Sequence, residues 1–285
     1  MRASTAEAVD WTTRPLREGK ALLQELLIGD DDDLENFQVL ITEHDSSFVT
    51  PRHRHNFDQL RWVLQGRWTA GRDKYVNEGE VAFFSDGTFY GGQGVEDMVV
   101  LNIKFGSPNG SGLMNGAVRQ GGYAELQETG TFEDGFYRPA AEDAAGDLRP
   151  RDAYEAIWEH LHGRPITYSK PPRYRDVLIM EPRSFHPRVL VPGVEVRPLG
   201  TFSEAGTEIR HVLAEAGAEV SFGCADHQVV LFLRRGRVTH EGTDYAGYAA
   251  FHLQRGEHAT FAVGERVELL ELRLPDLRHL SAAAR

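Results

Sequence analysis

Residues 50–66 read TPRHRHNFDQLRWVLQG and contain the pattern that decides how the chain folds. Two histidines, His53 and His55, stand two positions apart, ahead of an alternating segment that ends in a glycine. On a strand, residues two apart point to the same side, so the two imidazoles face one point, as a first-row transition metal requires. With the same parity, Gln59 and Arg61 share that side of the strand.

The opposite side of this segment is apolar. It carries Leu60, Trp62 and Leu64, and an apolar strand face of this kind needs a cover. A second copy of the chain would supply one, so we expect a homodimer. Asp58 points away from the histidines and stays a reserve ligand in case a kink reverses the parity.

Outward from this segment, 29 Gly and 13 Pro separate short apolar stretches that are rich in Val, Phe, Trp, Tyr and Ile. Such punctuation is typical of an all-β sandwich or barrel. Two series of strands have a similar rhythm, which predicts two related β units. The first series comprises residues 37–42, 47–50, 59–70, 74–76, 80–85 and 98–105, and the second comprises residues 194–199, 208–213, 219–222, 229–240, 249–253, 260–263 and 267–274.

Two helices are predicted beside these strands. Four leucines between positions 22 and 27 have helical spacing, which predicts an N-terminal helical segment over residues 1–35. Apolar side chains from Tyr154 to Leu161 recur at i, i+3, i+4 and i+7 and predict a helix over residues 151–162. The expected domains are therefore a helical segment (1–35), a first barrel (36–106), a connector with a loop and one helix (107–178) and a second barrel (179–285).

The charge of the chain limits its partners. Its 285 residues include 31 Lys and Arg against 43 Asp and Glu, a formal net charge of −12. Nucleic acids and anionic membranes are held mainly by Lys and Arg, so a small molecule is the expected partner instead. The single cysteine, Cys224, excludes an internal disulfide. Residues 1–23 lack the apolar run of a secretory signal, so we expect a cytoplasmic protein.

The spacing around the two histidines resembles the first motif of the cupin superfamily, and residues 79–90 are similar to the second motif. The resemblance implies RmlC-like jelly-roll barrels, also called double-stranded β-helices, and the second strand series makes the chain similar to a two-barrel bicupin. The matching positions are His53, His55, Gln59 and Gly66 in the first motif, and Gly79, Ser85, Gly87 and Tyr90 in the second.

The departures from the family pattern affect the expected metal site. The resemblance implies His53, His55 and Gln59 as ligands of Fe, Mn, Ni or Zn, but Gln59 stands where Glu is usual and Tyr90 replaces the last histidine. Loss of the carboxylate weakens the hold on a divalent ion. The phenol of Tyr90, with an ordinary pKa of about 10, suits hydrogen bonding or acid/base work. The alternative is a polar pocket in which the histidines bind no metal.

A substrate pocket is expected around this site. Arg61 is the nearby cation expected to face inward and clamp an anionic group, and Arg61 and Tyr90 are the candidate catalytic residues. The expected pocket residues are Phe57, Phe83, Tyr90 and Gln93.

The second β unit lacks the histidine pair. Aligning Gly236 with Gly66 puts Gly223 and Ala225 where the two histidines stand in the first unit. This alignment predicts a structural barrel, a dimerisation element or an apolar pocket.

A one-residue insertion gives an alternative for the second unit. It superposes Gln228 on Gln59, with His227 beside it, and it puts His258 in the place of the second-motif histidine. His227, His258 and Cys224 are then candidate zinc ligands.

The leading functional hypothesis follows from the resemblance. It implies a metal-dependent bicupin that acts on a small organic acid or phenolic compound, with dioxygenase chemistry in the first barrel. A non-catalytic sensor or storage barrel is the rival hypothesis. A cupin isomerase or lyase with Tyr90 as acid/base, or a metal-free epimerase, stays open, so the sequence leaves enzyme or binding protein undecided.

Overall fold

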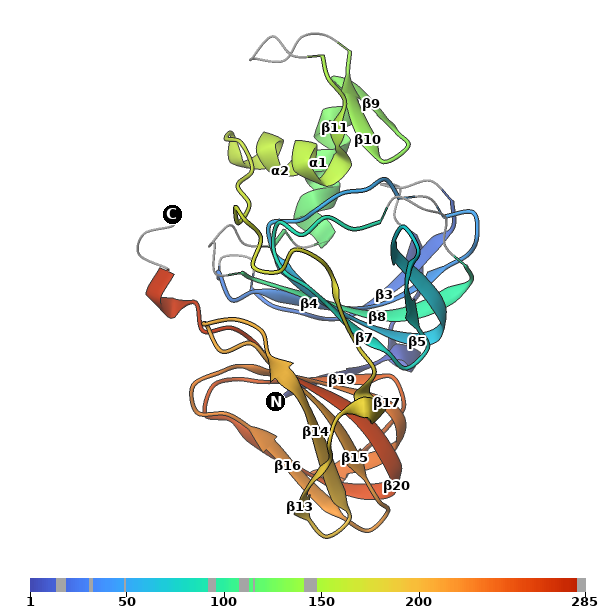
Figure 1. The fold of residues 1–285 in the computed structure, drawn as a ribbon, viewed down its shortest axis with the longest axis vertical. Coiled ribbons are helices and arrows are strands. Elements are labelled where there is room, and N and C mark those ends of the chain that lie inside the picture. Colours follow the sequence, from blue (N-terminus) through green and yellow to red (C-terminus); the bar gives the residue numbers. More distant parts are fainter. Residues whose placement is uncertain are drawn as a thin grey trace.

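Two β barrels are stacked along the long axis of the molecule, and a helical subdomain covers the outer end of the first barrel (Figure 1). This computed structural model describes residues 1–13, 19–30, 33–48, 50–91, 96–107, 113–114, 116–140 and 148–280. Antiparallel pairing dominates both large sheets. The predicted all-β architecture of two barrels is therefore confirmed.

The first barrel is an eight-stranded sheet in the order β12-β7-β5-β8-β4-β3-β2, with β6 paired to β5. Its central strand, β5, carries Gln59 and Arg61 on one side and Trp62 on the other. The strands are β2 (Thr12–Thr13), β3 (Ala21–Ile28), β4 (Phe37–His44), β5 (Asp58–Gly71), β6 (Lys74–Asn77), β7 (Val81–Phe84), β8 (Met98–Phe105) and β12 (Leu178–Met180).

The second barrel is a nine-stranded sheet in the order β1-β19-β17-β20-β15-β14-β13, with β16 paired to β20 and β18 to β17. Its strands are β1 (Arg2–Thr5), β13 (Arg188–Val191), β14 (Val194–Thr201), β15 (Glu208–Ala214), β16 (Glu219–Gly223), β17 (Val229–His240), β18 (Thr243–Ala246), β19 (Ala249–Leu253) and β20 (His258–Arg273). Short 3-10 turns lie at Ala6–Ala8, Pro182–Ser184 and Arg278–Leu280.

The two long strands β5 and β17 have equivalent positions in the two barrels, and a glycine in each strand supports this equivalence. Gly66 and Gly236 both have positive φ, at 78° and 89°. A Cβ on Gly66 would lie 2.2 Å from the Asp97 carbonyl oxygen, and one on Gly236 would lie 2.2 Å from that of Arg266. Only glycine fits such a position. The alignment of Gly236 with Gly66 therefore matches the structure.

The predicted N-terminal helix is wrong. Residues Ala21–Ile28 form the strand β3, which pairs with β4, and β1 joins the second barrel through β19. The register between β3 and β4 shifts between Glu25 and Leu27, which marks a bulge. A bulge adds a residue and interrupts the alternation of period two, so the buried leucines take a spacing that imitates a helix. Ser47 and Phe48, which belong to a segment expected as a strand, instead close a turn in which Phe48 N–H donates to the Asp45 carbonyl.

The connector folds into a small subdomain, here called the cap. It contains α1 (Gly116–Gln127), β9 (Gly130–Glu133), β10 (Phe136–Pro139), β11 (Arg151–Asp152) and α2 (Ala153–His162). The helix predicted over residues 151–162 corresponds to α2, but α1 was not expected because it contains three glycines, which are poor helix formers. One of them, Gly122, packs so closely that a Cβ there would lie 2.9 Å from Ile157 and Leu161 of α2. None of the helices in the described ranges is both long and apolar enough to span a bilayer.

The second barrel covers the apolar face of β5. Leu60, Trp62 and Leu64 are buried in one cluster with Phe232 of β17, and the rings of Trp62 and Phe232 are 6.3 Å apart. The cover expected from a second copy is thus supplied within the chain. The homodimer stays a prediction, without this face as its reason.

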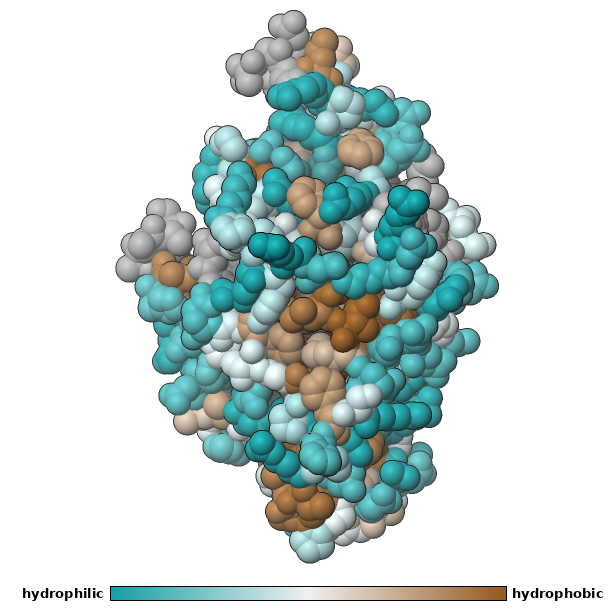
Figure 2. All heavy atoms as spheres, viewed as in Figure 1, coloured by the Kyte–Doolittle hydropathy of each residue, from teal (hydrophilic) through white to brown (hydrophobic). Residues whose placement is uncertain are grey.

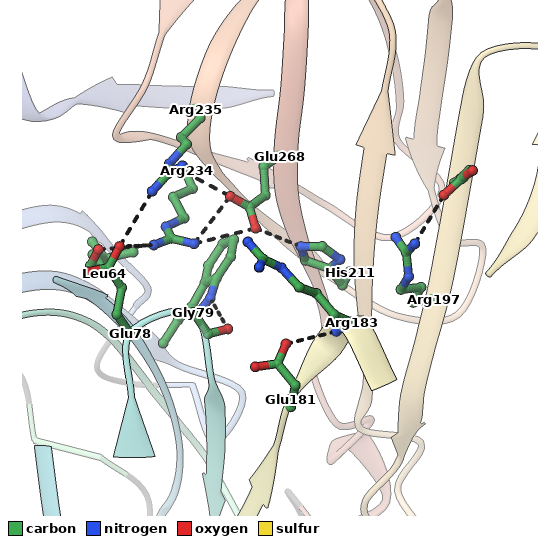
Figure 3. Close-up of polar contacts among 12 residues, drawn as sticks. Leu64, Glu78, Gly79, Glu181, Arg183, Arg197, His211, Arg234, Arg235 and Glu268 are labelled. Carbon is green, nitrogen blue, oxygen red and sulfur yellow. Dashed lines mark hydrogen bonds and ion pairs between the residues drawn. The ribbon is translucent and has the colours of Figure 1, made fainter. Parts of the chain in front are cut away.

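A buried polar cluster accompanies this contact between the barrels (Figure 3). Arg234 on β17 donates to the Leu64 carbonyl at 3.0 Å, and its guanidinium lies 5.2 Å from the Trp62 ring. The same guanidinium lies 3.3 Å from Glu268, which also contacts His211 at 3.0 Å. The second barrel therefore holds the backbone of β5 directly.

The far end of the second barrel exposes an apolar edge strand. Val189, Leu190 and Val191 of β13 are 68%, 61% and 48% exposed, and they form the brown patch at the lower end of Figure 2. β13 is hydrogen-bonded to β14 and ends its sheet.

Candidate functional site

The first barrel encloses a cavity of about 160 Å³ between its strands and the cap. Its walls come from β3, β4, β5 and β8, from both helices of the cap, and from Phe48, Thr50, His53 and His55. The lining residues are Ala21, Leu22, Leu23, Leu40, Thr42, His44, Phe48, Thr50, His53, His55, Gln59, Arg61, Trp68, Tyr90, Met98, Val100, Asn102, Lys104, Arg119, Ala153 and Tyr154.

The two histidines lie together at the wall of this cavity. Their ring centroids are 5.0 Å apart and the rings are nearly perpendicular. His53 forms an antiparallel bridge with Tyr90, and its ring Nδ1 lies 2.7 Å from the Pro51 carbonyl. A backbone carbonyl accepts only, so Nδ1 carries the proton when this bond forms, and the lone pair of the neutral ring is then on Nε2. The structure thus brings the predicted imidazole pair into one pocket.

Gln59, Tyr90 and Arg61 form a polar group beside the histidines. The Gln59 side-chain amide donates to the Tyr90 hydroxyl at 2.9 Å. The Arg61 guanidinium lies 3.5 Å from the Gln59 amide oxygen and 3.4 Å from the Tyr90 hydroxyl, which are long contacts. These three predicted residues are therefore adjacent, as the parity of β5 indicated.

Aromatic rings surround the Arg61 guanidinium. Its carbon lies 4.4 Å from the Trp68 centroid, 5.0 Å from that of Tyr90 and 5.1 Å from that of Phe84. Among the described residues no carboxylate is paired with it, and its Nε has no hydrogen-bond partner. Burial lowers the pKa of Arg61, because enclosure disfavours the charged form.

The charge of the lining is one-sided. Three basic side chains, Arg61, Lys104 and Arg119, line the cavity, and none of the described lining residues is Asp or Glu. This excess of positive charge lies inside a chain whose net charge is −12. The described lining of the cavity is therefore basic in a chain that is acidic as a whole.

Most of the lining residues were not predicted from the sequence, and four polar ones among them affect the chemistry of the cavity. Lys104 and Asn102 lie on β8, His44 on β4 and Arg119 on α1. Burial, with Arg61 nearby, lowers the pKa of His44 to about 4, so its ring is neutral at pH 7. The only available signal was the alternation of Asn102 and Lys104 within the otherwise apolar β8, MVVLNIKF.

Besides the Nε of Arg61, two buried polar atoms of the lining have no hydrogen-bond partner within the part of the chain that the structure describes. They are Nδ1 of His44 and Oδ1 of Asn102. Buried polar groups are normally hydrogen-bonded, so unpartnered atoms beside a cavity indicate that water or a ligand completes them.

Phe83 does not belong to the pocket. Adjacent residues of β7 point to opposite sides, and Phe83 faces the second barrel, with its ring 4.7 Å from Phe202. Phe84 is the residue on the cavity side, with its ring 4.7 Å from Tyr90. The pocket assignment of Phe83 is therefore wrong.

Phe57 supports the site from behind. It is buried in the core of the cap and stacks on His55 at 4.6 Å, and it is absent from the cavity wall. Phe57 therefore packs behind the site and does not line the pocket as expected. The chain turns between His55 and Asp58, so the alternation of an extended strand does not continue through Phe57. Gln93 lies outside the described residues.

Asp58 points away from the histidines, as expected. It is buried and accepts a hydrogen bond from the Asp86 N–H at 2.8 Å. Burial raises the pKa of Asp58 to about 7.

The candidate zinc site of the second barrel is not formed. His227 bonds through Nδ1 to the Leu274 carbonyl at 2.8 Å, and His258 is exposed at the start of β20, opposite Gly223. Cys224 packs at the edge of the apolar core. His227, His258 and Cys224 are not brought together, because across the described ranges no group of three or more His, Cys, Asp or Glu side chains is placed to hold a metal.

The first site has an incomplete set of donors for a resident divalent metal. Two imidazoles suit such an ion. The remaining predicted donors are the neutral amide of Gln59 and the phenol of Tyr90, which are hydrogen-bonded to each other. Arg61 adds a positive charge within 3.5 Å of both. Like charge repels the ion, and neutral oxygens replace the usual carboxylate. By itself this donor set does not fit a resident divalent ion.

Comparison with known proteins identifies the fold. No protein-family model matches the chain, and no curated protein matches it in sequence. Solved structures match over its whole length. GK1651 of Geobacillus kaustophilus is 13% identical, with a TM-score of 0.57, covering 97% of this chain and 96% of that one.

Two further structures agree with this match. A candidate dioxygenase of Nostoc punctiforme is 10% identical, with a TM-score of 0.62, covering 97% of this chain and 83% of that one. The oxalate decarboxylase of Bacillus subtilis, described with Mn(II) centres, is 14% identical, with a TM-score of 0.58, covering 97% and 78%. The chain therefore has the two-barrel cupin, or bicupin, fold.

Proposed function

We propose that this bicupin binds a small organic acid in the cavity of its first barrel. One observation carries the proposal: three basic side chains line the cavity without any acidic residue among the described lining. A buried charge is costly unless it is paired. The carboxylate of a ligand would pair with Arg61, which has no carboxylate partner among the described residues.

Arg61 is the proposed anchor of that carboxylate. A guanidinium offers donors in a planar fork that matches a carboxylate, and charge-assisted bonds of this kind are the strong ones. The Nε of Arg61 has no hydrogen-bond partner among the described residues, and the surrounding rings hold the guanidinium in place without neutralising it.

The apolar wall limits the rest of the ligand. Leu23, Leu40, Met98 and Val100 line the cavity beside the ring of Trp68. A cavity of about 150 Å³ lined by apolar side chains is large enough for benzene. The proposed ligand is thus a compact acid with an apolar body.

Calorimetric titration of chelator-treated protein tests this proposal. Benzoate is the probe, and benzamide, of the same shape without the charge, is its control. Loss of a charged hydrogen-bond pair typically costs about 1.5–3 kcal/mol. We therefore expect Arg61→Met to weaken benzoate binding by about 10- to 100-fold.

A matched control lies on the same strand. Arg67 is also on β5, but it is exposed and paired with Glu96, so Arg67→Met should leave benzoate binding unchanged. Equal binding of benzoate and benzamide, or equal affinity in the Arg61→Met and Arg67→Met proteins, would reject the proposal.

Metal-dependent oxygenase chemistry on such an acid is the second candidate. It is favoured by the convergence of His53 and His55, whose rings are 5.0 Å apart beside the cavity. Its test is the Fe, Mn, Ni and Zn content of purified protein against a His53→Ala/His55→Ala double variant, together with oxygen uptake in the presence of benzoate. Equal metal content in both proteins, with no oxygen uptake, would reject it.

A further inference from the structure

We infer that two copies of this chain associate through the edge strand β13, in antiparallel orientation about a twofold axis at Leu190. This inference is independent of the proposed function, because β13 belongs to the second barrel. It lies at the opposite end of the molecule from the cap (Figure 1). It gives the expected homodimer a surface and an orientation.

β13 exposes a continuous apolar surface, which is the brown patch at the lower end of Figure 2. Val189, Leu190 and Val191 are 68%, 61% and 48% exposed. Among the large hydrophobic residues exposed in the described part of the chain, they are the only ones that follow one another in sequence. Single exposed apolar residues are common on monomers, whereas contiguous patches mark interaction sites. β13 is therefore the described segment best suited to contact another chain.

A bulge explains why three consecutive residues are exposed. In the register with β14, Val189 is opposite Glu195 and Val191 is opposite Val194, so β13 carries one extra residue, Leu190. The extra residue of a bulge is left out of the ladder and breaks the alternation of the strand. The ladder to β14 therefore does not use the peptide groups of Leu190. The other edge of β13 ends the described sheet.

The outer edge of β13 can accept another strand over a short length only. Backbone groups at the edge of a sheet are a template for pairing with a second chain. Pro187 and Pro192 stand directly before and after β13, and proline has no N–H to donate to a ladder. The match is thus limited to the four residues of β13, which suits one paired contact and not the open-ended growth of a sheet.

A second copy of β13 fits this edge when it runs antiparallel. A twofold axis at Leu190 puts Leu190 opposite Leu190 and Val189 opposite Val191, so apolar side chains meet apolar side chains. Arg188 of each copy is then opposite the partner's Pro192, at the two ends of the contact. A parallel arrangement would place the two Arg188 side chains together, and like charges directly opposite each other are destabilising. The sequence of β13 therefore selects the antiparallel orientation.

Charge complementarity supports the same orientation. The Glu215 N–H donates to the carbonyl of Gly193, in the turn that follows β13, at 2.8 Å, and the Glu215 side chain is 59% exposed. In the antiparallel dimer, Arg188 lies beside this turn of the partner, within reach of the partner's Glu215. Glu215 also contacts Arg266 at 3.1 Å, and the two oxygens of a carboxylate can accept from both arginines. The dimer has two such contacts, one at each end.

The size of this contact sets its strength. Stable interfaces bury about 800 Å² per partner, and smaller ones are typical of weak and transient complexes. A single strand of four residues buries less than this area. We therefore expect a weak dimer, with a dissociation constant on the order of 100 μM.

Sedimentation velocity of the full chain, from about 1 to about 500 μM, tests the inference. The wild-type protein should change from monomer to dimer over this range. Leu190→Lys should weaken the dimer at least about tenfold, because the twofold axis brings the two new ammonium groups together. Leu148→Lys is the matched control, since Leu148 is a leucine of similar exposure, 55%, that lies before β11. It should leave the association unchanged.

An exchange of charges tests the orientation. Arg188→Glu should weaken the dimer by about three- to tenfold, since it places two carboxylates at each end of the contact. The double variant Arg188→Glu/Glu215→Arg should restore the wild-type association, because the same contacts form again with their charges reversed. All of the substituted side chains are exposed, so urea unfolding should show that every variant is folded.

The outcomes separate this inference from the proposed function. A wild-type protein that stays monomeric at every concentration would overturn the inference, and so would a dimer that persists in Leu190→Lys. Failure of the double variant to recover what Arg188→Glu loses would overturn the antiparallel orientation. Benzoate binding should be unchanged in Leu190→Lys, because β13 does not line the cavity of the first barrel.

Discussion

The two barrels share a topology but differ in the acidic residues that lie near their basic side chains. At the end of the second barrel, Arg210 and Arg273 contact Glu208 and Glu271 at 2.8 to 3.6 Å. Arg273 is opposite Val229 in the register, the position that Lys104 has opposite Gln59 in the first barrel. The same place in the fold thus holds basic groups in both barrels, with nearby acids in the second and none along the described wall of the first.

The interiors of the two barrels also differ in polarity. Where β5 carries Gln59 and Arg61, β17 carries Val229 and Leu231, which are fully buried in the hydrophobic core of the second barrel. The second barrel therefore fills these two positions with apolar core side chains. The cavity with the three basic side chains lies in the first barrel, which is why we place the proposed function there.

The largest expected effect concerns Asp58, whose counterpart in the second barrel is the neutral Gln228. Burial raises the pKa of Asp58 to about 7 from 3.8, so the folded state binds a proton that the unfolded state has lost. Stability should therefore fall as pH rises from about 4 to about 7, by about 4 kcal/mol in total. Urea unfolding of the wild-type and Asp58→Asn proteins at pH 5 and pH 8 measures it.

The Asp58→Asn protein should lose less stability between these pH values than the wild-type protein. Asp73→Asn is the control, since the Asp73 side chain is 88% exposed. If the free energy of unfolding changes with pH in parallel for the wild-type and Asp58→Asn proteins, the Asp58 carboxyl does not cause the expected pH dependence.

The next effect tests the paired charges of the second barrel. Glu208 contacts both Arg210 and Arg273 at 2.8 Å, so Glu208→Gln should lower the free energy of unfolding by about 2 kcal/mol, because it leaves two enclosed cations with less compensation. Glu265→Gln, at a side chain that is 66% exposed, should change it by less than about 0.5 kcal/mol. Similar denaturation midpoints for both variants would contradict the contrast.

The corresponding change in the first barrel should have the opposite sign. Arg61 is enclosed without an acid among the described residues, so Arg61→Met should raise the free energy of unfolding of the ligand-free protein by about 1 kcal/mol. Thermal and urea unfolding measure this change. If Arg61→Met lowers the free energy of unfolding, the Arg61 guanidinium of the wild-type protein is already compensated by other protein groups.

The smallest effect is expected at His258. It is exposed at the start of β20 and apart from His227, so His258→Ala should change stability by less than about 0.5 kcal/mol and leave ligand binding unchanged. Altered benzoate binding or metal content in this variant would give the second barrel a role in the site.

The sequence predicted regular strands well and irregular elements poorly. Alternation bounded by glycines located β17 and β19 at their observed limits. It failed at β3, where a bulge gives leucines a helical spacing, and at α1, where glycine needed for helix packing lowers helix propensity. Local pattern therefore identifies an element only when tertiary contacts do not alter its period.

Part of the candidate site was predicted from the sequence, and part of it was not. His53, His55, Gln59 and Arg61 were predicted because they belong to one continuous segment with one parity. Lys104, Arg119 and His44 were missed because only the closed sheet and the cap bring them to that segment. The excess of positive charge is a property of the assembled cavity, and no stretch of the chain displays it alone.

The alternation of side chains along β5 has a consequence for any effort to redesign this protein. Odd-numbered Arg61 faces the cavity and even-numbered Trp62 faces the second barrel, whose Arg234 grips the neighbouring Leu64 carbonyl. A slip of one residue would exchange the guanidinium and the indole between the two environments. Insertions or deletions in residues 58–66 should thus be lethal to folding, whereas selectivity can be evolved through β8 and the cap.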